Sequence, residues 1–483
     1  MASEQPQKRK RTIPLKILVD KQSNKVVFVE ATKEFVDTLF SFLSLPLGTI
    51  VHLLARNNND QQHSESSPFL GSINNLYQTV QNLDSNDVWN NPVCKQMLLH
   101  PRNPCGALCM NLFLNVDDTE PSSKIFVCDS CNTFTTFKNH DCTCGKPTNK
   151  QPQNLDYLLT KKTSYWNSTT VDSQKKVFFR ENYRSVFMVY LSDDLKIVPS
   201  SIMSSLQLLK ELGYSDLNQL EQVTHNIGKQ EILNILKYSL TSHEPLTNTI
   251  LTSSSENKDN LPSQSSSAVR VVPCTSGSSK MDIKVVHSKS QKKIIFAEAN
   301  GDFVNFIFSF LSTPLGSIVK LLGANSFAGC VGNLYKSVEY LDPKSVLLNP
   351  HRVFKSISGF EKKVEGGMFS KSRELIHDAK VLSELDPPNR SKEGVVGFVK
   401  RAALFGVEDD LTVKPLSATS CLSYFKESSI PLDDLEAKVI SIGEVEAFSL
   451  LRASLTSKFT LTSGLGDFLN VPEQQESTFT STN

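Results

Sequence analysis

The chain contains the same sequence pattern twice, and this repeat constrains its fold more than any other feature. Residues 15–56 read LKILVDKQSNKVVFVEATKEFVDTLFSFLSLPLGTIVHLLAR, and residues 283–322 read IKVVHSKSQKKIIFAEANGDFVNFIFSFLSTPLGSIVKLL. The two segments match at a constant offset of 268 residues. A chain of 483 residues is long enough for two or three domains, and the duplication reduces that range to two.

The two copies differ in length, because the offset between them changes along the chain. It falls to 258 where residues 75–77 match 333–335, and to 215 where residues 227–228 match 442–443. The first change reflects a ten-residue polar insertion near residues 57–66. The second leaves about 43 residues of the first copy without a counterpart, and a cysteine-rich segment lies in that stretch. This asymmetry suggests that the copies differ in role.

Local patterns predict the same elements in both copies. Two short apolar segments separated by KQSNK predict a β-hairpin, and Thr32 or Asn300 then stands where a helix N-cap belongs. Pro46 and Pro314 end that helix. A hairpin followed by a helix also resembles the start of a β-grasp fold, as in ubiquitin.

Each copy ends with a second shared unit. The segments SDDLKIVPSS and EDDLTVKPLS precede a glycine and an amphipathic helix, whose apolar spacing indicates a core stripe. The predicted fold class is therefore α+β, with two homologous modules. Each module is a β-hairpin followed by helices and a further hairpin–helix unit, and the first carries an inserted zinc-ribbon-like hairpin.

Composition places the boundaries between these parts. Hydrophobic residues make up 39% of the chain and charged residues 21%, which is enough apolar material for a core in each module. Few large apolar residues occur between the copies, where a Ser-rich composition favours a flexible linker. The predicted parts are a disordered basic tail (1–13), a first module (14–251) with the zinc-ribbon-like insert at about 101–150, a Ser-rich linker (252–281), a second module without the cysteine insert (282–470) and a polar tail (471–483).

The cysteine segment KIFVCDSCNTFTTFKNHDCTCGKP carries the strongest chemical signal. Cys128 and Cys131 form a C-x₂-C pair, and Cys142 and Cys144 form a C-x-C pair ten residues later. Four thiolates in two close pairs suit a tetrahedral Zn²⁺ site, and they predict a structural zinc ion. Because C-x-C is tighter than the usual second pair, His140 is an alternative ligand that could replace Cys142 or Cys144.

Other interpretations of the cysteines stay open. A C-x₂-C pair also serves thiol–disulfide exchange, but a redox site has no second pair nearby and lies at a helix start, which the sequence after Cys131 does not favour. Unligated buried cysteines are the simpler alternative. A catalytic zinc is disfavoured, because four thiolates leave no position for water.

No other motif indicates an enzyme. The carboxylate pairs Asp193-Asp194 and Asp409-Asp410 could serve acid–base or metal chemistry, but their position between short apolar runs favours ordinary turns. The histidines fall in no ligand or triad spacing, and the common nucleotide-binding, metalloprotease and hydrolase motifs are missing. The sequence therefore favours a non-enzymatic protein.

The charge pattern bears on location and partners. The N-terminal residues MASEQPQKRKRT have no apolar run behind their charges, and no stretch reaches the roughly 18 apolar residues of a membrane-spanning helix. We therefore expect an intracellular protein, cytoplasmic or nuclear, with no membrane partner. The run Lys8, Arg9, Lys10 and Arg11 is either a nuclear signal, a phosphate-binding arm or a solvated tail. With a net charge of +1 and few basic residues near the cysteines, nucleic-acid binding is only weakly supported.

Several of these segments resemble a known family. The hairpin–helix block, NLYQTVQNLD, CTCGK and IGKQEILNILKYSLTS are similar to the plant family catalogued as domain of unknown function 674. The resemblance covers most of both copies and implies a land-plant protein, with tandem copies and no assigned activity or catalytic residues. The resulting prediction is an interaction or scaffold protein with a structural zinc site and an unknown protein partner. The alternatives are a nuclear nucleic-acid-associated regulator and an enzyme of unrecognised type.

Overall fold

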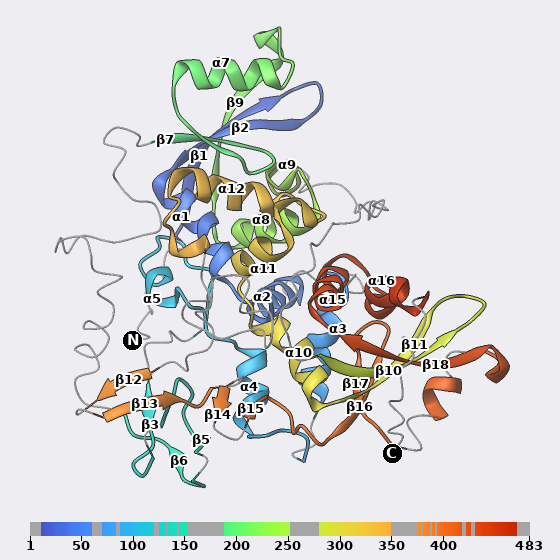
Figure 1. The fold of residues 1–483 in the computed structure, drawn as a ribbon. Helices are drawn as coiled ribbons and strands as arrows, with labels where there is room; N and C mark the ends of the chain where they lie inside the picture. The colour runs from blue at the N-terminus through green and yellow to red at the C-terminus, as the bar shows by residue number, and fades with distance from the viewer. Residues whose placement is uncertain are drawn as a thin grey trace, which may run out of the picture.

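The computed structural model in Figure 1 shows a mixed arrangement of helices and small sheets. It describes residues 11–59, 70–83, 87–119, 125–131, 133–142, 144–151, 188–251, 280–348, 374–377, 380–386, 389–391, 394–417, 422–426 and 430–470. Lys8, Arg9 and Lys10, most of the predicted linker and the C-terminal polar tail lie outside these residues.

Each repeat forms one five-stranded sheet in which every pairing is antiparallel. The first sheet has the order β8-β7-β2-β1-β9, and the second has the equivalent order β17-β16-β11-β10-β18. The strands of the first sheet are β1 (Ile13–Asp20), β2 (Lys25–Thr32), β7 (Met188–Ser192), β8 (Ile197–Pro199) and β9 (Leu220–Ile227). Those of the second are β10 (Met281–Ser288), β11 (Ile294–Asn300), β16 (Leu404–Glu408), β17 (Val413–Pro415) and β18 (Leu435–Ile442). The α+β class and the repeated hairpins are confirmed. The resemblance to a β-grasp fold is wrong, because that fold pairs its first and last strands in parallel.

The helices follow the predicted order in both repeats. In the first they are α1 (Lys33–Ser41), α2 (Leu47–Asn59), α3 (Ile73–Asn82), α4 (Val93–Leu99), α5 (Gly106–Cys109), α7 (Ile202–Glu211), α8 (Lys229–Thr241) and α9 (Pro245–Ile250). In the second they are α10 (Gly301–Ser312), α11 (Leu315–Leu322), α12 (Val331–Leu341), α15 (Glu444–Thr456) and α16 (Thr460–Leu465). Asn300 caps α10 by accepting from the backbone N–H groups of Asp302 and Phe303, whereas Thr32 occupies the N-cap of α1 without a side-chain bond. Within the described residues, no helix has the length and apolar character needed to cross a membrane.

Alternation along the strands explains which face of each sheet is buried. Ile13, Leu15 and Ile17 are buried on one face of β1, and Pro14 and Lys16 are exposed on the other. The apolar face needs helices to cover it, and the helices that do so do not all come from the same repeat.

The repeats exchange one helix with each other. Helix α12 of the second repeat lies among the elements of the first, and α3 of the first repeat lies beside β17 of the second (Figure 1). The Asn333 amide donates to the backbone O and the carboxylate of Asp194, over 2.9 and 3.0 Å. The equivalent Asn75 amide donates to the backbone O and the carboxylate of Asp410, over 3.2 and 3.1 Å.

A second pair of equivalent bonds joins the exchanged helices to the edge strands. The backbone N–H of Ile197 in β8 donates to the Ser337 hydroxyl over 3.1 Å, and that of Val413 in β17 donates to the Thr79 hydroxyl over 3.2 Å. Because both sheets receive their exchanged helix through the same kinds of bond, the exchange is reciprocal.

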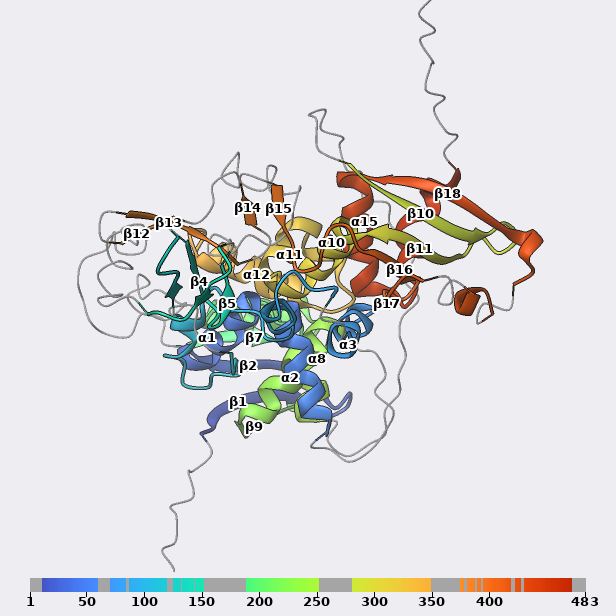
Figure 2. The same cartoon turned by 90° about the horizontal axis from the view of Figure 1, so that it is seen from below.

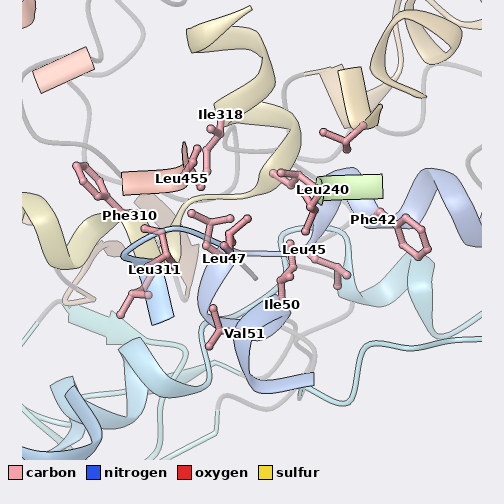
Figure 3. Close-up of a cluster of buried hydrophobic side chains, with 14 of the residues drawn as sticks. Phe42, Leu45, Leu47, Ile50, Val51, Leu240, Phe310, Leu311, Ile318 and Leu455 are labelled. Atoms are coloured by element: carbon pink, nitrogen blue, oxygen red, sulfur yellow. The ribbon is translucent and has the colours of Figure 1, made fainter. Parts of the chain in front are cut away.

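The two repeats also contact each other where α2 and α11 begin. The backbone N–H of Leu47 donates to the Thr313 carbonyl over 3.1 Å, and that of Leu315 donates to the Leu45 carbonyl over 2.9 Å. Figure 3 shows apolar side chains of both repeats packed together in this region, among them Leu45 and Leu47 of the first repeat and Leu311 and Ile318 of the second. One continuous hydrophobic core therefore includes residues of both repeats.

Candidate metal centre

Two short hairpins carry the predicted cysteine ligands. Strands β3 (Phe126–Val127) and β4 (Thr133–Thr135) form the first, and β5 (His140–Asp141) and β6 (Pro147–Thr148) form the second. Cys128 and Cys131 lie in the turn after β3, and Cys142 and Cys144 lie in the turn after β5. Each hairpin thus presents one pair of thiols, which is a zinc-ribbon-like arrangement.

The structure brings all four cysteines together. Their Sγ atoms lie within 4.8 Å of one another, and the Sγ atoms of Cys128 and Cys144 are 3.6 Å apart. Tetrahedral zinc with Zn–S bonds near 2.3 Å needs sulfur–sulfur edges of about 3.8 Å. The four thiols therefore fit a metal ion of this size with only small side-chain adjustments, and the cluster could bind one.

Backbone hydrogen bonds fix the two turns. The N–H of Cys128 donates to the Thr133 carbonyl over 3.1 Å, and that of Cys142 donates to the Lys146 carbonyl over 2.9 Å. Gly145 has a φ of +79°, a left-handed conformation that glycine adopts without strain, and its N–H donates to the Cys142 carbonyl. The local sequence thus sets the positions of the sulfurs.

The thiols differ in how readily they lose a proton. Burial raises the pKa of Cys142, but hydrogen bonds from the Cys144 backbone, the Thr133 hydroxyl and neighbouring thiols outweigh it and lower the pKa to about 6. Burial raises the pKa of Cys128, and interactions with Cys144 and Cys142 raise that of Cys131 to about 12. Cys142 therefore loses its proton more readily than Cys128 and Cys131, and a cation would stabilise the ionised form of these thiols.

His140, the alternative ligand, lies outside this group of sulfurs. Its side chain is buried, and its Nδ1 lies 2.9 Å from the Asp141 carbonyl and 3.4 Å from the Asn91 amide nitrogen. Within the described residues, only the four cysteines bring three or more His, Cys, Asp or Glu ligand atoms this close together.

The hairpin formed by β3 and β4, which we call the cysteine hairpin, also contacts the second repeat. Strand β4 pairs in parallel with β13 (Lys380–Glu384), which in turn pairs with β12 (Glu374–His377). Figure 2 shows β4 beside β13 at one end of the molecule. The insert of the first repeat therefore forms a small sheet, β12-β13-β4-β3, together with strands of the second.

The paired aspartates lie in turns, as predicted, and their carboxylates also accept hydrogen bonds from residues of nearby helices. Asp193 accepts hydrogen bonds from the N–H groups of Leu246 and Thr247 and from the Thr247 hydroxyl, at the start of α9. Asp409 accepts from the N–H and hydroxyl of Thr462 in α16. The first aspartate of each pair thus holds a helix of its own repeat, and the second accepts from the exchanged helix.

We expect Asp193 to make stability depend on pH. Burial raises its pKa from 3.8 to about 6, against the opposing hydrogen bonds from Thr247 and Leu246. A carboxyl whose pKa is raised by folding contributes stability that is present below the unfolded pKa and lost as the pH rises through the folded value. The stability of wild type relative to Asp193→Asn should therefore fall by about 1–2 kcal/mol between about pH 4 and pH 7.5, after allowance for partial exposure.

Urea unfolding of both proteins across that pH range measures this difference. Asp409→Asn should change in the same direction, because burial also raises the pKa of Asp409. A stability difference between wild type and Asp193→Asn that stays constant with pH, or that favours wild type more at the higher pH, would contradict this expectation. Either result would show that the attraction between the Asp193 charge and the start of α9 outweighs the effect of burial.

The structure gathers one polar cluster that sequence spacing did not indicate. His52 Nε2 lies 3.9 Å from Asp118 Oδ2, the ring centroids of His52 and His100 are 4.9 Å apart, and the Tyr77 hydroxyl is 3.4 Å from His52 Nδ1. These residues come from different segments of the first repeat, so no short motif could have revealed them. At these separations they form a partly buried polar cluster rather than a metal site.

The fold and the cysteine cluster define an α+β protein of two repeats with a zinc-ribbon-like hairpin. A family model described as protein of unknown function (DUF674) matches residues 9–445, so the chain belongs to this family. The match covers the first repeat, the cysteine residues and the second repeat as far as residue 445, which confirms the family predicted from the sequence. Searches of curated proteins and of solved structures gave no match.

Proposed function

We propose that this protein is a non-enzymatic interaction or scaffold protein in which Cys128, Cys131, Cys142 and Cys144 hold one structural zinc ion. The observation that carries the proposal is the convergence of four sulfurs from two hairpin turns within 4.8 Å. Four thiolates complete a tetrahedral shell and leave no position for a reacting water, so this centre suits a structural role. It would join two hairpins that are too short to be stable alone.

Exposed apolar side chains support a protein partner. On α7, Ile202 is 80% exposed and Met203 is 75% exposed, and Leu206 is also exposed. Exposed apolar side chains gathered in one place are typical of surfaces that contact other proteins. By contrast, Lys146 donates to the Ser130 hydroxyl and Lys150 pairs with Asp129, so these charges of the hairpin do not favour a nucleic-acid regulator over an interaction protein.

Metal analysis of the purified full-length protein tests the zinc site. We expect about one zinc ion per wild-type chain, and a fall to below about one tenth of that in Cys128→Ser and in Cys142→Ser, because each change removes a ligand. Cys330→Ser is a matched control, since Cys330 is buried at the start of α12 and its equivalent in the first repeat is Ser72. It should retain full zinc content. Wild type without zinc, or zinc that survives both ligand changes, would contradict the proposal.

A further inference from the structure

We infer that metal binding at the cysteine cluster controls the attachment of residues 380–386 of the second repeat to the cysteine hairpin of the first. This inference rests on the proposed metal site and extends it. The segment comprises β13 and the two residues that follow, Leu385 and Asp386.

Backbone pairing attaches the segment along the edge of β4. Ser383 pairs with Thr133 and Glu384 pairs with Phe134 in a parallel register, and the Leu385 N–H donates to the Phe134 carbonyl over 2.7 Å. Because β4 is only three residues long, this edge has few hydrogen bonds of its own to keep it ordered.

The Leu385 side chain attaches the segment to the metal ligands themselves. It is 7% exposed and belongs to one apolar cluster with Cys128 and Cys142, against which Cys131 also packs. Its burial therefore depends on the cysteine side chains keeping their positions.

Asp386 provides a third attachment at the far end of β4. Its carboxylate accepts from the Thr136 N–H over 3.0 Å, from the Thr136 hydroxyl over 2.5 Å, and from the Thr135 hydroxyl. At the other end of β4, the Thr133 hydroxyl lies 3.3 Å from Cys142 Sγ. A single short strand thus connects a metal ligand to the carboxylate of the second repeat.

These contacts make the attachment depend on the metal. Without a cation, no metal–sulfur bond joins the turn of Cys128 and Cys131 to the turn of Cys142 and Cys144, although their sulfurs lie within 4.8 Å of one another. Hairpins of two or three residues per strand do not persist without such a staple. When the hairpins loosen, the edge of β4 and the cover over Leu385 are lost together. The presence or absence of the metal therefore affects residues 380–386 of the second repeat through their contacts with β4.

Hydrogen exchange of the full-length protein, measured peptide by peptide, tests this coupling. After zinc is removed by a chelator, and in Cys128→Ser, exchange in peptides covering 133–136 and 380–386 should become at least about tenfold faster. Peptides covering β10 and β11 should keep their wild-type rates, because they lie in the second sheet. If zinc is lost and residues 380–386 exchange as before, the coupling is refuted and the metal site stands. If wild type holds no zinc, both fail.

An Asp386→Ala variant separates attachment from metal binding. It removes the acceptor for Thr135 and Thr136 and leaves every sulfur in place, so zinc content should match wild type while residues 380–386 exchange at least about tenfold faster. Asp433→Ala changes an exposed aspartate of the same repeat and should alter neither quantity. Unchanged exchange in Asp386→Ala would overturn the role given to this carboxylate and, with it, the proposed connection.

Discussion

Replacing Gly329 or Gly71 with valine is expected to destabilise the whole molecule by at least about 3 kcal/mol, because each glycine lies against backbone of the other repeat. A Cβ atom on Gly329 would lie 2.3 Å from the Ser239 carbonyl oxygen and 2.6 Å from the Leu240 carbonyl carbon. A Cβ atom on Gly71 would lie 2.4 Å from the Ser454 carbonyl oxygen, and the φ of +50° adds strain for any other residue. Neither clash can be relieved by turning a side chain, since the opposing atoms are backbone.

Urea unfolding followed by circular dichroism measures the loss. Gly466→Ala is a matched control, because a Cβ atom there meets nothing within 4 Å, and its stability should stay within about 0.5 kcal/mol of wild type. Both valine variants should lower the stability of both repeats together, since they share one core. Wild-type stability in either variant would mean that the exchanged helices do not pack as closely as the structure shows.

The elements of each repeat could be predicted because their signals are local. Alternation between buried and exposed residues predicts β1, and Asn300 and Pro314 mark where α10 begins and where the next helix follows. The four cysteines could be predicted for the same reason, since each hairpin turn places two ligands by sequence spacing alone.

The helix exchange could not be predicted, because the repeat makes two arrangements equivalent in sequence. Asn75 has an aspartate acceptor available in either repeat, Asp194 in its own and Asp410 in the other. The apolar stripe of α3 shows that the helix covers a sheet, but both sheets present the same kind of surface. The sequence of the helix alone therefore does not decide which of the two sheets it covers.

The contact between the hairpin and the second repeat was missed for a different reason. Leu385 and Asp386 form an ordinary dipeptide, and their partners lie about 250 residues away in the sequence: Phe134 for Leu385, and Thr135 and Thr136 for Asp386. Asp193 and Asp409 are similar, since a turn could be predicted but the helix that each one caps could not. Long-range polar contacts of this kind depend on the tertiary fold, and local propensity does not specify them.

The bonds between the repeats should be sensitive to charge, and Asn333→Asp should cost about 2–3 kcal/mol at neutral pH. In wild type the Asn333 amide donates to Asp194 over 3.0 Å. The substitution replaces that donor with a second carboxylate at the same distance, so attraction becomes repulsion. Asn75→Asp should have a similar effect against Asp410, since the geometry there is equivalent.

A second change at Asp194 should restore part of this loss. With Asn333→Asp and Asp194→Asn combined, the new amide can donate back to the new carboxylate, and at least half of the lost stability should return. Recovery should stay incomplete, because Lys196 loses the carboxylate that it pairs with over 2.8 Å and the Asp194 carbonyl loses its donor. A double-mutant cycle by urea unfolding should give a coupling energy of about 1–2 kcal/mol. If the two changes are simply additive, Asn333 and Asp194 do not meet, and the reciprocal exchange that joins the repeats would have to be abandoned.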